Sequence, residues 1–213
     1  MKQIVFGTPF EQPLRHCVRT GRSILQAAKR LVTPKDINQR YDEETFAVMK
    51  RTLSRGSNCV DVGCHLGEML RECIRLAPQG QHFAFEPLPH LFGILRSEFG
   101  NMPNVSLYDC VLSDCEGTTH FQHVVSNPAF SGIQKRSYPR ENEQVVEIEV
   151  KQVPLDFLIP ETQEIDFIKI DVEGAELQVL RGAKKTIERP ITTGHNQSRY
   201  STFYAMNVDC MFF

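Results

Sequence analysis

Two glycines and two acidic residues in the first half of the chain are spaced as in a nucleoside-binding site. Gly63 and Gly67 follow a short apolar stretch that contains Asp61. Because glycine has no Cβ, such a turn between a strand and a helix lets the backbone approach a ligand closely. Glu86 lies 19 positions after Gly67, where nucleotide sites of α/β proteins place a carboxylate that binds the ribose hydroxyl groups. We therefore expect these four residues to bind a nucleoside.

The turn lacks the residues of two common phosphate-binding motifs. A dinucleotide fingerprint, G-x-G-x-x-G, requires glycine where this chain has His65, and a P-loop requires a G-K-S/T sequence that this segment does not contain. A nucleoside without phosphates therefore fits better than a dinucleotide or a triphosphate. Two structural alternatives stay open: Glu86 only caps the turn before Pro87, and Asp61 only stabilises its own turn.

A second group of charged residues follows an apolar run late in the chain. Lys169 lies within the run 165–171, where an ammonium group is costly unless it meets a partner. Alternate residues of a strand share a face, so Asp171 is the expected ion-pair partner. Asp171 and Glu173 are two positions apart where this strand ends, so both can face one crevice. Capping the helix predicted at 174–181 is an equally physical use for Glu173.

Alternating strands and helices must position these residues. Apolar residues at helical spacing predict helices, and short apolar or alternating runs predict strands. The predicted helices cover 42–54, 66–77, 89–99 and 174–181, the last closed by Gly182, and the predicted strands cover 59–62, 82–86, 105–112, 120–125, 145–153 and 165–171. This order predicts an α/β fold with a doubly wound, mainly parallel sheet that binds ligands at the carboxyl ends of its strands.

The predicted sheet accounts for only part of the chain. Residues 1–41 are expected to form a helical appendage with an amphipathic helix at 20–32, which serves as a cap on the main domain or as a partner-binding arm. Residues 42–213 are expected to form the main domain. A polar loop at 126–139, between two predicted strands, is expected to shape the specificity of the site.

Composition and charge exclude several classes of protein. The 213 residues, 41% apolar and 23% charged, fit one ordinary domain and not a collagen, a coiled coil or a disordered chain. A net charge of −2 provides no overall attraction to nucleic acid or to an anionic membrane, and without tryptophan no stacking platform suggests a nucleic-acid acceptor. No stretch approaches the ~20 apolar residues of a membrane span, so neither an anchor nor a signal peptide is expected. The seven cysteines are expected to be reduced thiols of a cytoplasmic protein, with no metal site.

Three segments resemble the FkbM family of class I S-adenosylmethionine-dependent methyltransferases. Residues 59–68 are similar to the family's cofactor loop, Phe85-Glu86-Pro87 to its ribose-binding motif, and residues 168–176 to its most distinctive signature. Weaker similarities cover 112–117 and 153–158.

The resemblance, which spans roughly 45–190, implies an activity and a set of site residues. It implies that the sulfonium methyl group of S-adenosylmethionine is transferred to a hydroxyl group of a small molecule or a carbohydrate. The cofactor-binding residues would be Asp61, Gly63, His65, Gly67, Glu86, Asp114 and Asp171, with Asp114 near the adenine. A base that takes the hydroxyl proton can accelerate such a step by ~10²–10⁴-fold. The candidate catalytic residues are Asp171, Glu173 and His195.

Departures from the family pattern keep other functions open. Cys64 and His65 stand where the family commonly has alanine and asparagine, and after Pro190 the chain lacks the family's apolar strand that ends in glutamate. We therefore expect the last strands of the sheet to be incomplete, with His195 a candidate to replace that glutamate. The alternatives are a catalytically inactive nucleoside-binding or partner-binding domain of the same fold, and an NAD-dependent oxidoreductase.

Overall fold

The computed structural model describes residues 37–126, 128–133, 144–172, 174–189, 191–192, 198–199 and 202–205. The elements below belong to the unit 42–213, except that the first helix begins a few residues before it. The helix predicted at 20–32 lies outside the described residues, so the appendage at 1–41 stays a prediction.

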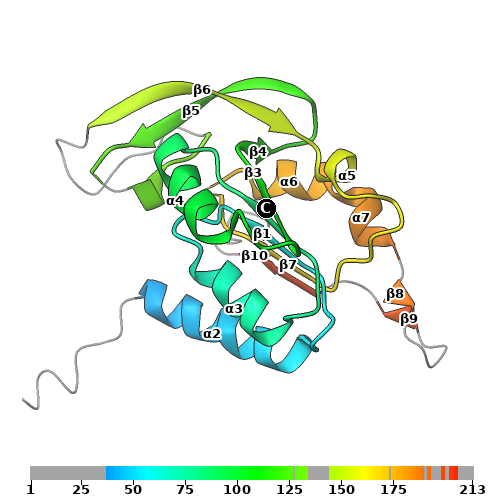
Figure 1. Cartoon of the computed structure of the whole chain (residues 1–213). Coiled ribbons are helices and arrows are strands. Elements are labelled where there is room, and N and C mark those ends of the chain that lie inside the picture. The colour runs from blue at the N-terminus through cyan, green and yellow to red at the C-terminus, as the bar shows by residue number, and fades with distance from the viewer. Residues whose placement is uncertain are drawn as a thin grey trace, which may run out of the picture. The chain divides into compact units, whose positions relative to one another are not determined.

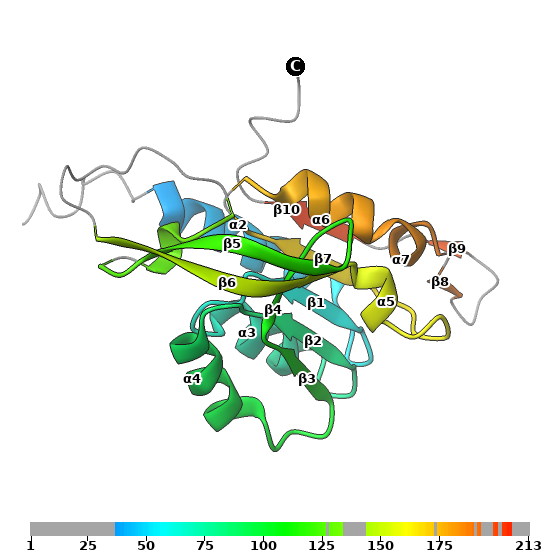
Figure 2. The same ribbon diagram turned by 90° about the horizontal axis from the view of Figure 1, so that it is seen from above.

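Five parallel strands form the main sheet at the centre of the fold (Figure 1), in the order β10-β7-β1-β2-β3 that Figure 2 shows. These strands are β1 (Cys59–Val62), β2 (His82–Phe85), β3 (Val105–Tyr108), β7 (Phe167–Ile170) and β10 (Thr202–Ala205). Every residue of β1, β2 and β7 is buried, as expected for parallel strands that are covered on both faces. The predicted α/β fold with a mainly parallel sheet is confirmed. The edge strand β10 was not predicted from the sequence.

Helices cover both faces of this sheet. One face packs against α2 (Ile37–Thr52), α3 (Glu68–Leu76) and α4 (Pro89–Phe99), and the other against α5 (Leu155–Leu158), α6 (Glu176–Gly182) and α7 (Lys184–Glu188). Met49 of α2, Cys73 of α3 and Phe167 of β7 share one apolar cluster, whereas Ile168 of β7 and Val179 of α6 share the cluster on the opposite face. None of the helices in the described part of the chain is long and apolar enough to cross a bilayer.

A second, three-stranded sheet has the order β4-β6-β5. Its strands are β4 (Cys110–Leu112), β5 (Gly117–Val124) and β6 (Val145–Val153). The last two match the strands predicted at 120–125 and 145–153. β5 and β6 pair in an antiparallel ribbon, which extends well past the strands of the main sheet (Figure 2), and a short helical turn, η1 (Pro128–Phe130), follows β5. A two-residue ladder joins β8 (Ile191–Thr192) to β9 (Ser198–Arg199).

The single strand predicted at 105–112 is wrong. The chain leaves the main sheet at Asp109, so that β3 and β4 belong to different sheets. Both halves are apolar, so the local pattern contains no sign of the break. Cys110 and Leu112 pack into the core of the main sheet, whereas Val111 packs into the core under the second sheet. Alternate side chains of β4 therefore join the two cores.

The glycine at the end of α6 is needed for close packing. The sequence analysis placed Gly182 just after a helix at 174–181, whereas the structure has it as the last residue of α6. A Cβ at Gly182 would lie 1.9 Å from the carbonyl oxygen of Ser113, in the segment that follows β4. The backbone of α6 therefore rests directly on the backbone after β4.

We expect Gly182→Ala to lower the free energy of unfolding by ~1–3 kcal/mol, because the new methyl group would overlap a backbone oxygen that cannot move without shifting β4. Urea denaturation measures this change. Gly93→Ala is the matched control, since Gly93 lies in α4 with no atom within 4 Å of its added Cβ. The control should be as stable as the wild type or more stable by ~0.5–1 kcal/mol. Equal stability of Gly182→Ala and Gly93→Ala would contradict the close approach of α6.

Candidate functional site

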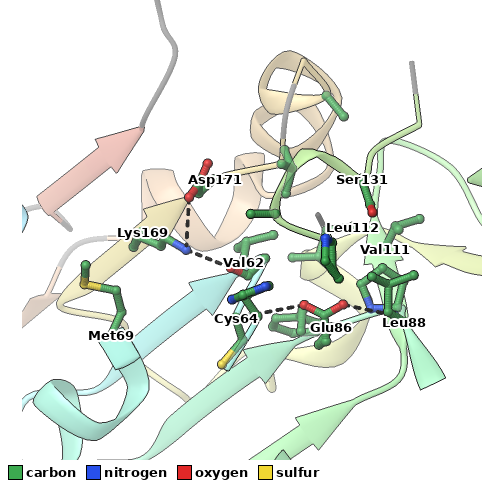
Figure 3. A pocket seen from close by; sticks show the side chains of 18 of the residues that line it. Val62, Cys64, Met69, Glu86, Leu88, Val111, Leu112, Ser131, Lys169 and Asp171 are labelled. Carbon is green, nitrogen blue, oxygen red and sulfur yellow. Dashed lines mark hydrogen bonds and ion pairs between the residues drawn. The ribbon is translucent and has the colours of Figure 1, made fainter. Parts of the chain in front are cut away.

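A cavity of about 170 Å³ lies at the carboxyl ends of β1, β2 and β7 (Figure 3). The turns after these strands form one part of its wall, and β4, β5 and the η1 turn form another. Parallel sheets bind ligands at this edge, because the turns of neighbouring strands converge there. The acidic and basic residues of its wall are Asp42, Glu68, Glu86, Lys169 and Asp171, and His65 joins them.

The turn after β1 requires glycine at position 63. The φ angle of Gly63 is +74°, and a Cβ there would lie 2.0 Å from the backbone oxygen of Asp171. The amide of Asp171 also donates a hydrogen bond to the carbonyl of Val62 at 3.0 Å. The turn after β1 and the turn after β7 are therefore in backbone contact at the cavity.

Three amide groups of this turn already have partners within the chain. Gly63 and Cys64 both donate to the carbonyl oxygen of Phe85, at 3.1 and 3.0 Å. The amide of His65 donates to the Glu86 carboxylate at 2.9 Å. The turn therefore contributes the shape of its backbone to the cavity, and not these three donors.

His65 occupies the position of the second glycine of the dinucleotide fingerprint and has a left-handed backbone conformation. Its φ angle is +51°, a region in which histidine and asparagine are found more often than most other residues. Burial lowers the pKa of the His65 ring, so the neutral form predominates at pH 7. Its ring lines the cavity, and its role in cofactor binding stays a prediction.

Glu86 is a buried carboxylate in the wall of the cavity (Figure 3). Its residue exposure is 5%, and its two oxygens accept hydrogen bonds from the amides of His65, at 2.9 Å, and Leu88, at 3.0 Å. Burial raises the pKa of Glu86 to about 7, although the two hydrogen bonds act in the opposite direction. Glu86 thus stabilises the turn before Pro87, as one alternative proposed, and also faces the cavity as the ribose-binding prediction requires.

Lys169 is a buried cation whose ammonium contacts several groups at the charged end of the cavity (Figure 3). The sequence predicted Asp171 as its partner, and the two groups lie 3.8 Å apart. Asp61 is closer, at 3.2 Å, and the ammonium also donates to the carbonyl of Gly63 at 2.8 Å. Burial lowers the pKa of Lys169, but the charges of Asp61 and Asp171 outweigh burial and leave the pKa above its ordinary value.

Asp61 acts on the cavity indirectly, through its ion pair with the lining residue Lys169. It is 1% exposed and is not among the residues of the cavity wall, and neither of its carboxylate oxygens has a well-aligned hydrogen bond within the described residues. Asp61 and Lys169 are register partners on the paired strands β1 and β7. Asp61 therefore interacts with the charge of Lys169. This agrees with the alternative that Asp61 stabilises the turn, because the Lys169 ammonium also donates to the carbonyl of Gly63 in that turn.

The opposite end of the cavity is apolar. Leu88 follows Glu86 directly, and Val111 and Leu112 come from β4. The η1 turn and the residues just after it complete this wall with Pro128, Ala129, Ser131 and Ile133. The described part of the loop predicted to shape specificity therefore lines the cavity.

Other predicted site residues lie elsewhere. Asp114 is exposed and lies 3.9 Å from Arg181, outside the cavity wall, so its place near the adenine stays a prediction. Gly67 has a φ angle of +80° and packs against α4, where a Cβ would lie 2.8 Å from Phe99. Glu173 and His195 are outside the described residues.

One acidic lining residue, Asp42 of α2, was not predicted from the sequence. Glu68, the first residue of α3 and the last of the segment 59–68 that resembles the family's cofactor loop, also lines the cavity. Asp42 looks locally like an ordinary polar residue on the outer face of a helix, so the sequence contains no signal for its position at the cavity. Among the described residues, no group of three or more His, Cys, Asp or Glu residues is arranged to hold a metal ion.

Comparisons with known proteins identify related sequences. A family model described as the methyltransferase FkbM domain matches residues 61–207. The 2-O-methyltransferase NoeI of Sinorhizobium fredii is 29% identical over 145 residues, which cover 61% of this chain and 58% of that protein. Methyltransferase 1 of Beauveria bassiana is 28% identical over 142 residues, which cover 58% of this chain and 57% of that protein. The chain thus spans little more than half the length of these curated relatives. A solved rRNA methylase from Streptococcus thermophilus aligns with a TM-score of 0.40 and 13% identity, over 68% of this chain and 62% of that chain.

We expect Lys169→Met to lower the free energy of unfolding by ~3–5 kcal/mol, because the variant leaves the buried Asp61 carboxylate without a counter-ion. Urea denaturation measures the loss. Adding Asp61→Asn to this variant should recover part of it, since the uncompensated charge is removed. Lys184→Met is the control on an exposed ion pair and should change stability by less than ~0.5 kcal/mol. A small loss in Lys169→Met, equal to that of the control, would contradict the role of this ammonium.

We expect the stability difference between the wild type and Glu86→Gln to depend on pH. The pKa of Glu86 is raised from 4.5 to about 7 on folding, so the folded state favours the protonated carboxyl. Its contribution is complete below pH 4.5 and is lost as the pH rises through 7, by about 3 kcal/mol in total. Urea unfolding of both proteins at pH 5 and pH 8 should give a larger advantage for the wild type at pH 5. A difference that is the same at both pH values would contradict the raised pKa.

Proposed function

The chain belongs to the FkbM methyltransferase domain family, and on this premise we propose that it transfers a methyl group from S-adenosylmethionine to a hydroxyl group of a small molecule or a carbohydrate. The observation that carries the proposal is the cavity in which the turn after β1, Glu86 and the segment after β7 meet. All three lie within the matched residues 61–207.

The cavity has the chemistry that a nucleoside cofactor requires. Each Glu86 oxygen accepts one backbone hydrogen bond and keeps a further lone pair for a ribose hydroxyl group. The apolar end formed by Leu88, Val111 and Leu112 suits the flat face of a purine. The missing Cβ of Gly63 lets the turn after β1 lie directly against the backbone of Asp171, so that Glu86 and Asp171 line one cavity. The residues present therefore fit S-adenosylmethionine, with the ribose at Glu86.

The protein residues position the reacting groups, because the cofactor itself supplies the methyl group. When bound, S-adenosylmethionine supplies a methyl group on a positively charged sulfur that is attacked in line by a nucleophile. Alignment of the reacting groups can lower a barrier by up to ~7–11 kcal/mol in favourable cases. Of the predicted catalytic residues Asp171, Glu173 and His195, the structure describes Asp171, whose side chain is 28% exposed at the cavity. Its carboxylate can accept a hydrogen bond from the hydroxyl group of an acceptor and orient it.

A hydroxyl group of a small molecule or a carbohydrate is the acceptor that we propose. The relative from Sinorhizobium fredii is named a 2-O-methyltransferase, which favours a hydroxyl acceptor. Pro128, Ala129 and Ser131 of the loop expected to set specificity line the end of the cavity where we place the purine, so a contact between this loop and the acceptor stays a prediction. A nucleic-acid acceptor is not part of the proposal, and a cytoplasmic location stays a prediction.

Calorimetry should show that S-adenosylmethionine and S-adenosylhomocysteine bind the full chain, whereas NAD does not. Glu86→Gln should weaken both complexes about 5–30-fold, because a charge-assisted hydrogen bond to the ribose is lost. Glu116→Gln, on an exposed residue outside the cavity wall, is the matched control and should bind like the wild type.

Three results would change the proposal. Tighter binding of NAD than of S-adenosylmethionine would favour the oxidoreductase alternative. Binding of S-adenosylmethionine without methyl transfer to any hydroxylated acceptor would favour an inactive nucleoside-binding domain. An unchanged dissociation constant in Glu86→Gln would contradict the ribose contact.

A further inference from the structure

The end of the cavity near α2 holds more negative than positive charge. Asp42, Glu68 and Asp171 line it, and Lys169 is the only lysine or arginine among the described residues of the cavity wall. The Lys169 ammonium is already close to Asp61, which is not part of that wall, and to the carbonyl of Gly63. The carboxylates of Asp42, Glu68 and Asp171 therefore have one lysine ammonium near them. That ammonium lies closest to a further carboxylate outside the cavity wall, Asp61.

Asp42 is the lining carboxylate with the least compensation. Asp171 has Lys169 at 3.8 Å, and Glu68 begins α3, where a negative charge interacts favourably with the helix N-terminus. The half-buried Asp42 makes no ion pair with any residue that the structure describes. Burial raises the pKa of Asp42, and the negative charges of Glu68 and Asp171 raise it further, whereas the charge of Lys169 lowers it without cancelling the rise. The partly buried negative charge of Asp42 is therefore energetically costly, and a cation bound beside it would lower that cost.

The order of the strands shows which part of a bound nucleoside would reach Asp42. Glu86 follows β2, Gly63 follows β1 and Asp171 follows β7, and these strands are neighbours in the order β2-β1-β7. Leu88, which follows β2, shares an apolar cluster with Val111, so the apolar end of the cavity lies on the β2 side, away from Lys169 and Asp171 (Figure 3). With the base at that end and the ribose at Glu86, the group on the 5′ carbon extends past Gly63 toward the carboxylates.

We propose that Asp42 binds the α-ammonium group of the cofactor's amino-acid portion. The inference rests on the proposed function, since it takes S-adenosylmethionine as the ligand. An ammonium group donates up to three hydrogen bonds, and hydrogen bonds between charged groups are about twice as strong as neutral ones. Asp42 lies outside residues 61–207, so the family match does not assign this role to it.

The test compares two ligands that differ in this group. 5′-Methylthioadenosine has the adenosine portion and no amino-acid portion, so it should depend on Glu86 and not on Asp42. In calorimetry with the full chain, Asp42→Asn should weaken S-adenosylmethionine about tenfold and change 5′-methylthioadenosine by less than about twofold. Glu44→Gln, on an exposed residue of the same helix, is the matched control and should bind both ligands like the wild type.

The outcomes separate this inference from the proposed function. If Asp42→Asn weakens both ligands equally, or neither, the assignment of Asp42 is overturned. If Glu86→Gln weakens both ligands while Asp42→Asn has no effect, the proposed function stands and only this inference fails. If the wild type binds neither ligand, the proposed function fails and the inference fails with it. Thermal unfolding of each variant shows whether a loss of binding comes from a loss of folding.

Discussion

A single buried ammonium connects the main sheet to the cavity. Lys169 lies in β7 beside Asp61 in β1, donates to the carbonyl of Gly63 in the turn after β1, and faces Asp171 in the turn after β7. Buried charges cost several kcal/mol each unless they are paired. The two strands and the two turns must therefore keep their relative positions for the charges to be balanced. The ion pairs of Lys169 therefore fix the shape of the charged end of the cavity.

The two sheets give the cavity two different ends. Turns of the main sheet provide the charged end, where a ribose and a charged substituent find polar partners. β4 and the η1 turn provide the apolar end through residues such as Val111 and Pro128. Because β4 joins both apolar cores, the second sheet is held firmly against the main one. A ligand with a flat apolar ring, a sugar and a charged tail matches this order of surfaces.

Much of this arrangement was readable in the sequence. The spacing of Gly63 and Glu86 predicted a nucleoside site, and both residues line one cavity. The Lys169 ion pair with Asp171 was expected from strand alternation, but the shorter contact to Asp61 was not. Asp42 was missed altogether, because a polar residue on a helix looks the same whether it faces solvent or a cavity.

The sequence by itself determined the buried strands β1, β2 and β7, the antiparallel pair β5 and β6, most helix positions, the glycine turn and the family signature, since each depends on residues within a short window. Tertiary structure alone decided that Asp61 and Lys169 are partners, that the chain changes sheets at Asp109, and that Asp42 reaches the cavity. The physical reason is that periodicity and turn chemistry act between neighbours in the chain. The order and register of strands instead bring together residues that are far apart in it, and no local pattern records that choice.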